Sequence, residues 1–246
     1  MTLKHVCGKI KVGRSCVWFR LKKGGIIMMN MYNDYSEQAN ANIACLFEDN
    51  EYSERKNGFL KAIKAFNEAG IRFGMACSFN LFLRGRVDEF HDFDLIVDWA
   101  DVPKVKEIME KLGGQMVRSG GNGFCESEAF MSYELGRCDF DIISGFKVIT
   151  FGTQYLYRYS EDEIEYIELY DDDEEIRVPM ITMEALYILY AMMEGWQPKR
   201  KFKRILIQSA LEDEIRFPSV FEDALSNQNL PGWLKYEMRK LLAKNF

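Results

Sequence analysis

The sequence has no apolar stretch near the length of a membrane span. Its best candidate, residues 24–29, falls far short of the roughly 20 apolar residues needed to cross a bilayer. Histidine occurs only at His5 and His91, and none of the 6 cysteines belongs to a Cys-x-x-Cys pair, so a zinc site has few possible ligands. We therefore expect no membrane association and reduced thiols in a cytoplasmic protein.

Proline and glycine are not enriched, and the net charge is only −6 over 246 residues. These values argue against a disordered chain, a collagen-like repeat and a surface that coats nucleic acid. Apolar residues make up 48% of the chain, which is enough to bury a sizeable core. The composition is that of one domain, or of one domain with a small appendage.

The charge is unevenly distributed, because residues 1–33 contain basic residues and no acidic one. Such an arm can contact a nucleic acid or an anionic surface. We favour a mobile extension, or upstream sequence ahead of a true start at Met28 or Met29. The division that we expect is a basic arm and lead-in at 1–52, a mixed α/β domain at 53–180 and a helical region at 181–246.

From residue 53 the hydrophobic pattern alternates between helical and strand periods. Gly120–Gly123 has turn chemistry, and the acidic stretch 161–175 is interrupted by apolar residues, which favours a solvated hairpin. The sequence therefore predicts an α+β fold, in which a mixed β-sheet core flanked by helices precedes a helical C-terminal region. The expected helices are 54–69, 78–83, 101–112, 183–194, 199–211, 219–225 and 234–243, and the expected strands are 71–73, 93–97, 115–119 and 137–143.

Two Asp-x-Asp pairs lie within apolar runs of strand length. Since side chains alternate across a strand, Asp92 and Asp94 share one face, and so do Asp139 and Asp141. Neighbouring strands could thus direct several carboxylates to one point. Without a cation such a cluster resists ionisation, whereas Mg²⁺ takes hard oxygen ligands and bridges carboxylates to substrate phosphates. Carboxylates that only line a solvated sheet face are the alternative.

The stretch from Ile71 through Cys77-Ser78 to Asp92-Phe-Asp94 resembles the signature of nucleotidyltransferases related to DNA polymerase beta. That signature consists of a strand, a Gly-Gly or Gly-Ser turn that opens a helix, and an Asp-apolar-Asp on the next strand. The resemblance covers residues 58–145. The antibiotic-modifying lincosamide and aminoglycoside nucleotidyltransferases look nearest, given the stretch from Arg86 to Asp94 and the helical region that follows the strands.

The resemblance implies roles for particular residues. Asp92, Asp94 and a third aspartate would hold two Mg²⁺ ions, and Ser78 would lie at the turn that binds the triphosphate. The third aspartate is expected to be Asp141, with Asp139 as the alternative, since Asp141 lies deeper in its apolar run. Cys77 stands where the family usually has glycine, so its side chain could crowd a phosphate that must approach the backbone.

A basic run, Lys199 to Arg204, opens one of the C-terminal helices. Cations are unfavourable at a helix N-terminus, so an anion such as a triphosphate or an RNA backbone could supply the missing charge. Lys199 and Arg200 are therefore candidate nucleotide contacts. A solvated basic face is the alternative.

These residues and the resemblance predict a Mg²⁺-dependent nucleotidyltransferase. Such an enzyme moves a nucleoside monophosphate from a nucleoside triphosphate to an acceptor hydroxyl and releases pyrophosphate. A small-molecule acceptor is expected first. A tRNA or a protein acceptor, as in toxin–antitoxin systems of this superfamily, is an alternative. An inactive binding module with the same fold is the second hypothesis, and Cys77 is the residue that favours it.

Overall fold

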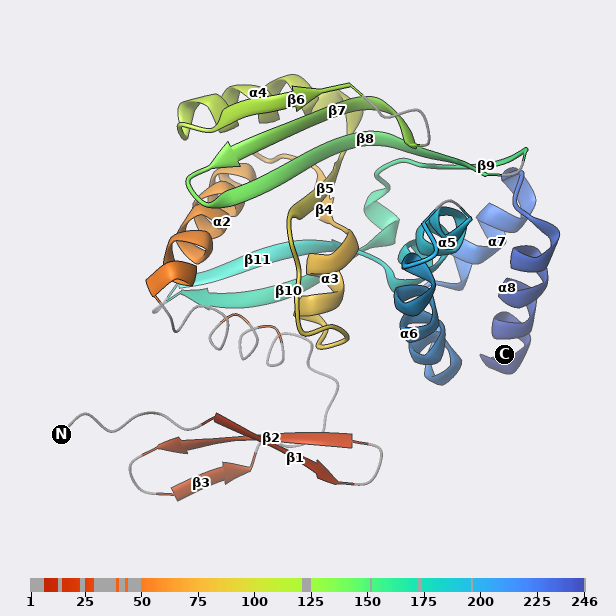
Figure 1. Cartoon of the computed structure of the whole chain (residues 1–246), viewed down its shortest axis with the longest axis horizontal. Helices are drawn as coiled ribbons and strands as arrows, with labels where there is room; N and C mark the ends of the chain where they lie inside the picture. The colour runs from red at the N-terminus through yellow and green to blue at the C-terminus, as the bar shows by residue number, and fades with distance from the viewer. Residues whose placement is uncertain are drawn as a thin grey trace.

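The computed structural model of the chain describes residues 7–12, 15–22, 25–28, 39, 43, 50–120, 125–150, 152–171, 174–195 and 197–245 (Figure 1). Near the N-terminus three strands pair antiparallel in the order β1-β2-β3. They are β1 (Cys7–Val12), β2 (Ser15–Lys22) and β3 (Gly25–Met28). The expected basic arm thus contains paired strands that the sequence analysis does not predict, although Val17, Phe19 and Leu21 alternate with the period of a strand.

The main sheet is mixed and contains eight strands, seven of them in the order β10-β11-β4-β5-β8-β7-β6, with β9 paired to β8. The β5–β8 and β11–β4 pairs are parallel, and the other pairs are antiparallel. The strands are β4 (Phe73–Met75), β5 (Phe93–Val97), β6 (Gln115–Ser119), β7 (Cys125–Leu135), β8 (Cys138–Thr150), β9 (Thr153–Tyr157), β10 (Ile164–Asp171) and β11 (Glu174–Ile181).

Three helices accompany the strands of the first half of the domain, namely α2 (Asn50–Glu68), α3 (Cys77–Leu83) and α4 (Val102–Lys111). The apolar stripe of α2 is buried, as its spacing predicts, and Phe59 lies 4.9 Å from Phe93 between ring centroids. Phe93 in turn stacks on Phe140 of β8 at 5.0 Å. Phe79 and Phe90 complete this aromatic cluster, which fixes α2, α3, β5 and β8 to one another.

The C-terminal region consists of α5 (Met183–Glu194), α6 (Arg200–Asp213), α7 (Pro218–Asn227) and α8 (Gly232–Asn245), which gather at one end of the sheet (Figure 1). Helix α5 begins at the cap Thr182, whose Oγ1 accepts a hydrogen bond from the amide of Ala185. Every residue of α5 from Met183 to Met193 is buried, because β8, β9, α6 and α7 all pack against it. Within the described residues, no helix combines the length and apolarity needed to cross a membrane.

The expected α+β architecture is confirmed, and most differences concern the strands. Helix α2 begins three residues before the expected cap Ser53, and β4 lies two residues beyond the expected strand at 71–73. A short 3-10 helix, η2 (Glu161–Glu163), precedes the acidic hairpin, which forms as β10 and β11. The prediction missed β7 and β9. Glu126, Glu128 and Glu134 lower the strand propensity of β7, and the glycine-rich stretch ahead of it lies partly outside the described residues.

Removal of residues 1–28 tests whether the N-terminal strands support the core. Strands β1, β2 and β3 pair with one another in a sheet of their own, which is not hydrogen-bonded to the main sheet. A chain that starts at Met29 should therefore fold and melt within about 3 °C of the full chain, since a change of that size is near 1 kcal/mol for a protein of this length. Differential scanning calorimetry measures the difference. A fall of about 10 °C would show that the strands pack on the domain.

Candidate active site

The parallel pairing of β5 with β8 brings two aspartates side by side. In the register Phe93 pairs with Phe140, and Asp94 pairs with Asp141. The phenylalanines are buried on one face of the sheet, so alternation places both aspartates on the other face, where they are half-buried. Asp92 precedes β5 on the same face as Asp94. Carboxylate oxygens of Asp92, Asp94 and Asp141 all lie within 4.8 Å of one another.

Burial and mutual repulsion raise the pKa of two of these carboxyls. Desolvation, and then the charges of Asp92 and Asp141, raise the pKa of Asp94 to about 8. The pKa of Asp141 is also raised, by desolvation first and by the neighbouring charge of Asp92. A cation at this point would favour the ionised forms of all three carboxyls. The cluster thus has the electrostatics of a cation site.

Residues of β6 and β7 support the third carboxylate. The Ser132 hydroxyl of β7 donates a hydrogen bond to Oδ1 of Asp141, and the two residues pair in the β7–β8 register. The charge of Arg118 on β6 lowers the pKa of Asp141, against the larger effect of burial. Sequence reasoning missed both residues, because β7 was not predicted and its register sets which side chain faces Asp141. No motif in the sequence marks either of them.

Helix α3 begins at the edge of this cluster. The Ala76 amide donates a hydrogen bond to the Asp94 carbonyl at 2.8 Å, and Cys77 follows at φ +50°, in the left-handed region that favours glycine. The Cys77 thiol interacts with the Asp94 carboxylate, and burial raises the pKa of this thiol well above its ordinary value. The protonated thiol is a poor nucleophile. Ser78 is the second residue of α3 and is buried.

Cations from α6 face the carboxylates. The positive charge of Arg200 lowers the pKa of both Asp94 and Cys77, against the larger effect of their burial. Lys203, one turn further along α6, also interacts with the charges of Asp92 and Asp94. The pKa of Lys203 is nevertheless lowered, mainly by desolvation and secondly by the positive charge of Arg200. Both cations lie over the ring of Tyr190 in α5, at 5.5 and 5.9 Å from its centroid. The sequence analysis named Arg200 but not Lys203.

Two of the sequence candidates lie outside the cluster. Asp139 is exposed, whereas Asp141 two residues later on the same strand lies within the group of three. Lys199 precedes α6 and is exposed, whereas Arg200 is half-buried beside Asp94 and Cys77. Placement in the structure thus favours Asp141 over Asp139 and Arg200 over Lys199.

The donor set fits Mg²⁺ better than a softer metal. Asp92, Asp94 and Asp141 offer hard carboxylate oxygens, and within the described part of the chain no other group of three acidic, histidine or cysteine side chains lies close enough to share an ion. The nearby sulfur is the protonated Cys77 thiol, which is not in the form that binds metals. Three carboxylates leave room for water and for the oxygen atoms of a substrate around the ion.

No known family model matches the chain, and no curated protein matches it. Among solved structures, the chain is similar to a Thermotoga maritima protein provisionally classed as a nucleotidyltransferase, at 14% identity and a TM-score of 0.48, over 63% of this chain and 93% of that one. It is also similar to the antibiotic-resistance factor ANT(2″)-Ia. The solution structure of that factor aligns at 17% identity and a TM-score of 0.46, over 77% of this chain and 95% of that one. Its crystal structure with adenylyl-2″-tobramycin aligns at 13% identity and a TM-score of 0.44, over 75% of this chain and 94% of that one.

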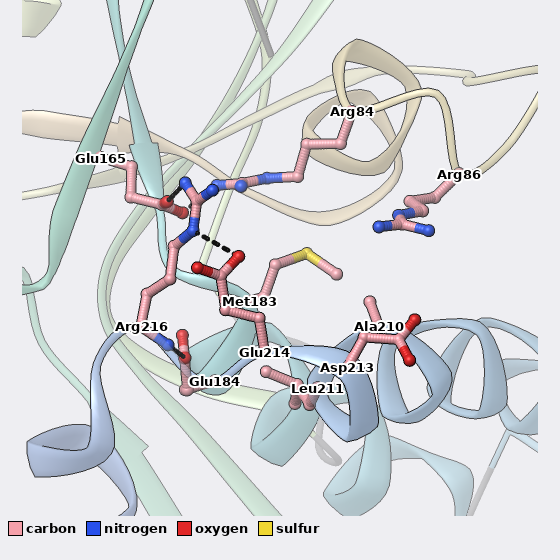
Figure 2. A pocket seen from close by; sticks show the side chains of 10 residues that line it. All are labelled: Arg84, Arg86, Glu165, Met183, Glu184, Ala210, Leu211, Asp213, Glu214 and Arg216. Atoms are coloured by element: carbon pink, nitrogen blue, oxygen red, sulfur yellow. Dashed lines mark hydrogen bonds and ion pairs between the residues drawn. The ribbon is translucent and has the colours of Figure 1, made fainter. Parts of the chain in front are cut away.

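A charged pocket of about 420 Å³ lies at the C-terminal end of α3, where Arg84 and Arg86 line it (Figure 2). Arg84 crosses it with a buried side chain that donates to Glu165 of β10 at 2.5 Å and to Asn80 at 2.7 Å. Glu165 also pairs with Arg216, which precedes α7, at 3.2 Å. These contacts join α3 to the sheet and to the C-terminal helices. Because its buried charges are paired, we interpret this pocket as a structural junction.

Replacement of Arg84 tests the junction. Arg84→Met retains the length of the side chain but removes the charge, which leaves the Asn80 Oδ1 without its donor and Glu165 with Arg216 as its remaining cationic partner. We expect a loss of about 3 kcal/mol in the free energy of unfolding, or about 6–12 °C in melting temperature. The matched control is Arg86→Met, an exposed arginine of the same pocket, which should change stability by less than about 0.5 kcal/mol. An equal loss of stability in Arg84→Met and Arg86→Met would contradict the interpretation of this pocket as a structural junction.

Proposed function

We propose that the chain is a Mg²⁺-dependent nucleotidyltransferase, which transfers a nucleoside monophosphate from a nucleoside triphosphate to an acceptor hydroxyl and releases pyrophosphate. The observation that carries this proposal is the cluster of Asp92, Asp94 and Asp141 on adjacent strands, with the cations of α6 facing it. Carboxylates beside fixed cations suit a substrate that brings both metal ions and phosphate oxygens.

The residues of the chain divide into two groups in this proposal. Asp92, Asp94 and Asp141 hold Mg²⁺, which when bound polarises the phosphate oxygens and lowers the pKa of the acceptor hydroxyl. Arg200 and Lys203 bind the triphosphate, whose negative charge offsets the repulsion between these two neighbouring cations. Ser78 lies beside Cys77 at the turn that opens α3, where the resemblance places a triphosphate contact.

The proposed transfer joins the nucleoside monophosphate to the acceptor oxygen and releases pyrophosphate. The acceptor oxygen attacks the α-phosphorus and forms a new O–P bond, while the bond from that phosphorus to the bridging oxygen breaks. Pyrophosphate leaves with the electron pair. The hydroxyl proton passes to a carboxylate oxygen of Asp141, which Ser132 holds in place. Arg200 and Lys203 stabilise the charge that develops on the leaving pyrophosphate.

We propose a small molecule as the acceptor, with tRNA and protein acceptors as the other outcomes of an acceptor screen. A second candidate function is a nucleotide-binding module without transfer activity. The conformation of Cys77 favours it, because a side chain with φ +50° stands at the turn that a phosphate must approach.

Asparagine substitutions test the metal site. Asp92→Asn, Asp94→Asn and Asp141→Asn each remove a ligand charge at nearly constant shape. Each should lower nucleotide transfer, or Mg²⁺-dependent binding of a non-hydrolysable triphosphate analogue where the acceptor is unknown, by about 100-fold or more. Isothermal titration with each triphosphate analogue and a labelled-nucleotide transfer assay measure the two effects. Circular dichroism checks that each variant is folded.

The matched control is Asp139→Asn, on the same strand and face but exposed. It should retain activity within about tenfold, since its carboxylate lies outside the cluster. If Asp139→Asn is inactive and Asp141→Asn is active, the assignment of the third ligand is wrong. If all four variants retain full transfer and binding, the shared metal site has to be abandoned.

Replacement of Cys77 distinguishes the two candidate functions. Cys77→Gly removes the side chain beside Asp94 and relieves a left-handed conformation that costs other residues about 1–2 kcal/mol. It should tighten binding of the triphosphate analogue several-fold. Cys77→Ala retains a Cβ at the same φ, so its affinity for the triphosphate analogue should increase less than that of Cys77→Gly. Transfer by Cys77→Gly alone would identify the natural chain as an inactive module, and weaker binding by Cys77→Gly would show that the thiol contributes to the site.

A further inference from the structure

Four large apolar side chains are exposed on α6 and α8. On α6 they are Ile205 and Phe202, which is 66% exposed, and on α8 they are Trp233 and Tyr236, which is 67% exposed. Residues three apart in a helix lie on the same side of it. Each helix therefore has one exposed apolar side, while its buried residues pack toward the domain. Single exposed apolar side chains are common, but a contiguous group indicates a binding surface.

Contacts between the two helices bring these exposed sides together. The Arg204 guanidinium lies 5.7 Å from the centroid of the Trp233 ring, and one turn further along each helix Gln208 donates a hydrogen bond to Glu237 at 2.9 Å. The helices thus lie side by side and run in the same direction (Figure 1). Because both turn their buried side chains toward the domain, their exposed sides form one surface. We name this surface the α6–α8 face, defined by Phe202, Ile205, Trp233 and Tyr236.

The same face contains two lysines. Lys201 lies four residues before Ile205 in α6, and Lys240 lies four residues after Tyr236 in α8. At that spacing each lysine shares the side of its apolar neighbour. Both lysines are exposed, and neither pairs with a carboxylate among the described residues. The face therefore combines aromatic rings with cations that have no partner in the described part of the chain.

The charge of the two helices is opposite to that of the whole chain. Helix α6 has four basic and two acidic residues, and α8 has four basic and one acidic, whereas the net charge of the chain is −6. Two of these acidic side chains already have partners, since Glu212 pairs with Lys244 at 3.5 Å and Glu237 accepts the hydrogen bond from Gln208. A local positive region on an acidic protein favours an anionic partner.

The mixture of rings and lysines distinguishes between the possible anionic partners. Lysine is depleted in protein–protein interfaces. A helix that lies on a membrane keeps its lysines on the side opposite its apolar residues, whereas Lys201 and Lys240 lie on the apolar side. A second copy of the chain would bring like charges together. Single-stranded nucleic acid fits, because its bases stack on exposed aromatic rings in any sequence and its phosphates attract lysines.

We propose that the α6–α8 face binds single-stranded nucleic acid, with bases stacked on its exposed rings and phosphates at Lys201 and Lys240. Arg200 and Lys203 of the same helix face the aspartate cluster, so they are not part of this face. The proposal is therefore independent of the metal site, of the triphosphate and of the acceptor that the chain uses.

Fluorescence anisotropy of the full chain with labelled oligonucleotides of about 12 uridines or thymidines tests the proposal. The buffer contains EDTA, so that no Mg²⁺ joins a phosphate to the aspartate cluster. We expect saturable binding with a Kd on the order of 1–100 µM. Affinity should fall about 7–50-fold from about 50 to about 200 mM salt, which corresponds to two to four phosphate contacts. A difference between the two oligonucleotides would show whether RNA or DNA is preferred.

An abasic oligonucleotide of the same length tests the role of the rings. It keeps the phosphates and lacks the bases, so it should bind about tenfold more weakly or worse. The double variant Phe202→Leu/Tyr236→Leu keeps apolar side chains and removes two rings, and it should weaken binding of the uridine oligonucleotide about fivefold or more. Circular dichroism checks that the variant is folded, which is expected because both positions are exposed.

The double variant Lys201→Gln/Lys240→Gln tests the phosphate contacts. It should reduce the slope of log affinity against log salt by about 1.4, since each contact contributes about 0.7 for a single strand. Matched controls remove the same groups elsewhere. Trp99→Leu changes an exposed ring in the short helix η1 (Trp99–Asp101), and Lys61→Gln changes an exposed lysine of α2. Both controls should bind the oligonucleotide like the natural chain.

Four results would overturn the proposal. The first is the absence of saturable binding of either oligonucleotide at about 100 µM protein in low salt. The second is equal binding of the abasic oligonucleotide, which would show that the rings take no part. The third is unchanged affinity in both double variants, or an equal loss in the controls, which would place the strand elsewhere, such as on the basic residues of the N-terminal arm. The fourth is binding of phosphatidylserine vesicles without binding of the oligonucleotides, which would identify a membrane as the partner.

Discussion

The stacking of Phe93 on Phe140 fixes the geometry on which the candidate site depends. Both phenylalanines are fully buried in one core cluster, in which Phe93 also contacts Phe59 of α2 and Phe79 of α3. Neither strand can therefore shift by one residue without placing an aspartate in the apolar core. The alternation of side chains then directs Asp94 and Asp141 to the opposite face, in register with each other. The free energy of aromatic burial on one face thus holds together carboxylates that repel each other on the other face.

The acidic and basic residues of the candidate site come from different parts of the chain. The carboxylates come from the sheet, and the cations that face them come from α6, in the C-terminal region. Helix α5 packs against both β8 and α6 and is buried along its length. Its Tyr190 ring contacts both cations of α6, Arg200 and Lys203. The C-terminal helices therefore complete the candidate site. Their attachment through Arg84, Glu165 and Arg216 helps to set where Arg200 lies relative to Asp94.

The sequence was sufficient to predict the elements whose patterns are local. The period of α2, the apolar run of β5 and the helices after Thr182 could all be identified, and Asp92 and Asp94 could be named as candidates that lie close together. What could not be predicted depends on contacts between distant strands. The partner of β6 is β7, whose glutamates obscure its alternation, and Ser132 faces Asp141 only through that pairing. The left-handed φ of Cys77 could not be predicted from the sequence either, because glycine is the residue that normally indicates such a position.

The parallel pairing of β5 with β8 also determines where this protein can tolerate changes in chain length. The chain between them passes through α4, β6 and β7, so the turns of that connection can gain or lose residues without moving Asp94 relative to Asp141. A deletion that shifts the β8 register by one residue would instead turn Phe140 toward the face that carries Asp94 and bury an aspartate. Homologous chains should therefore vary in length at the ends of β6 and β7 and keep the spacing of these residues within β8.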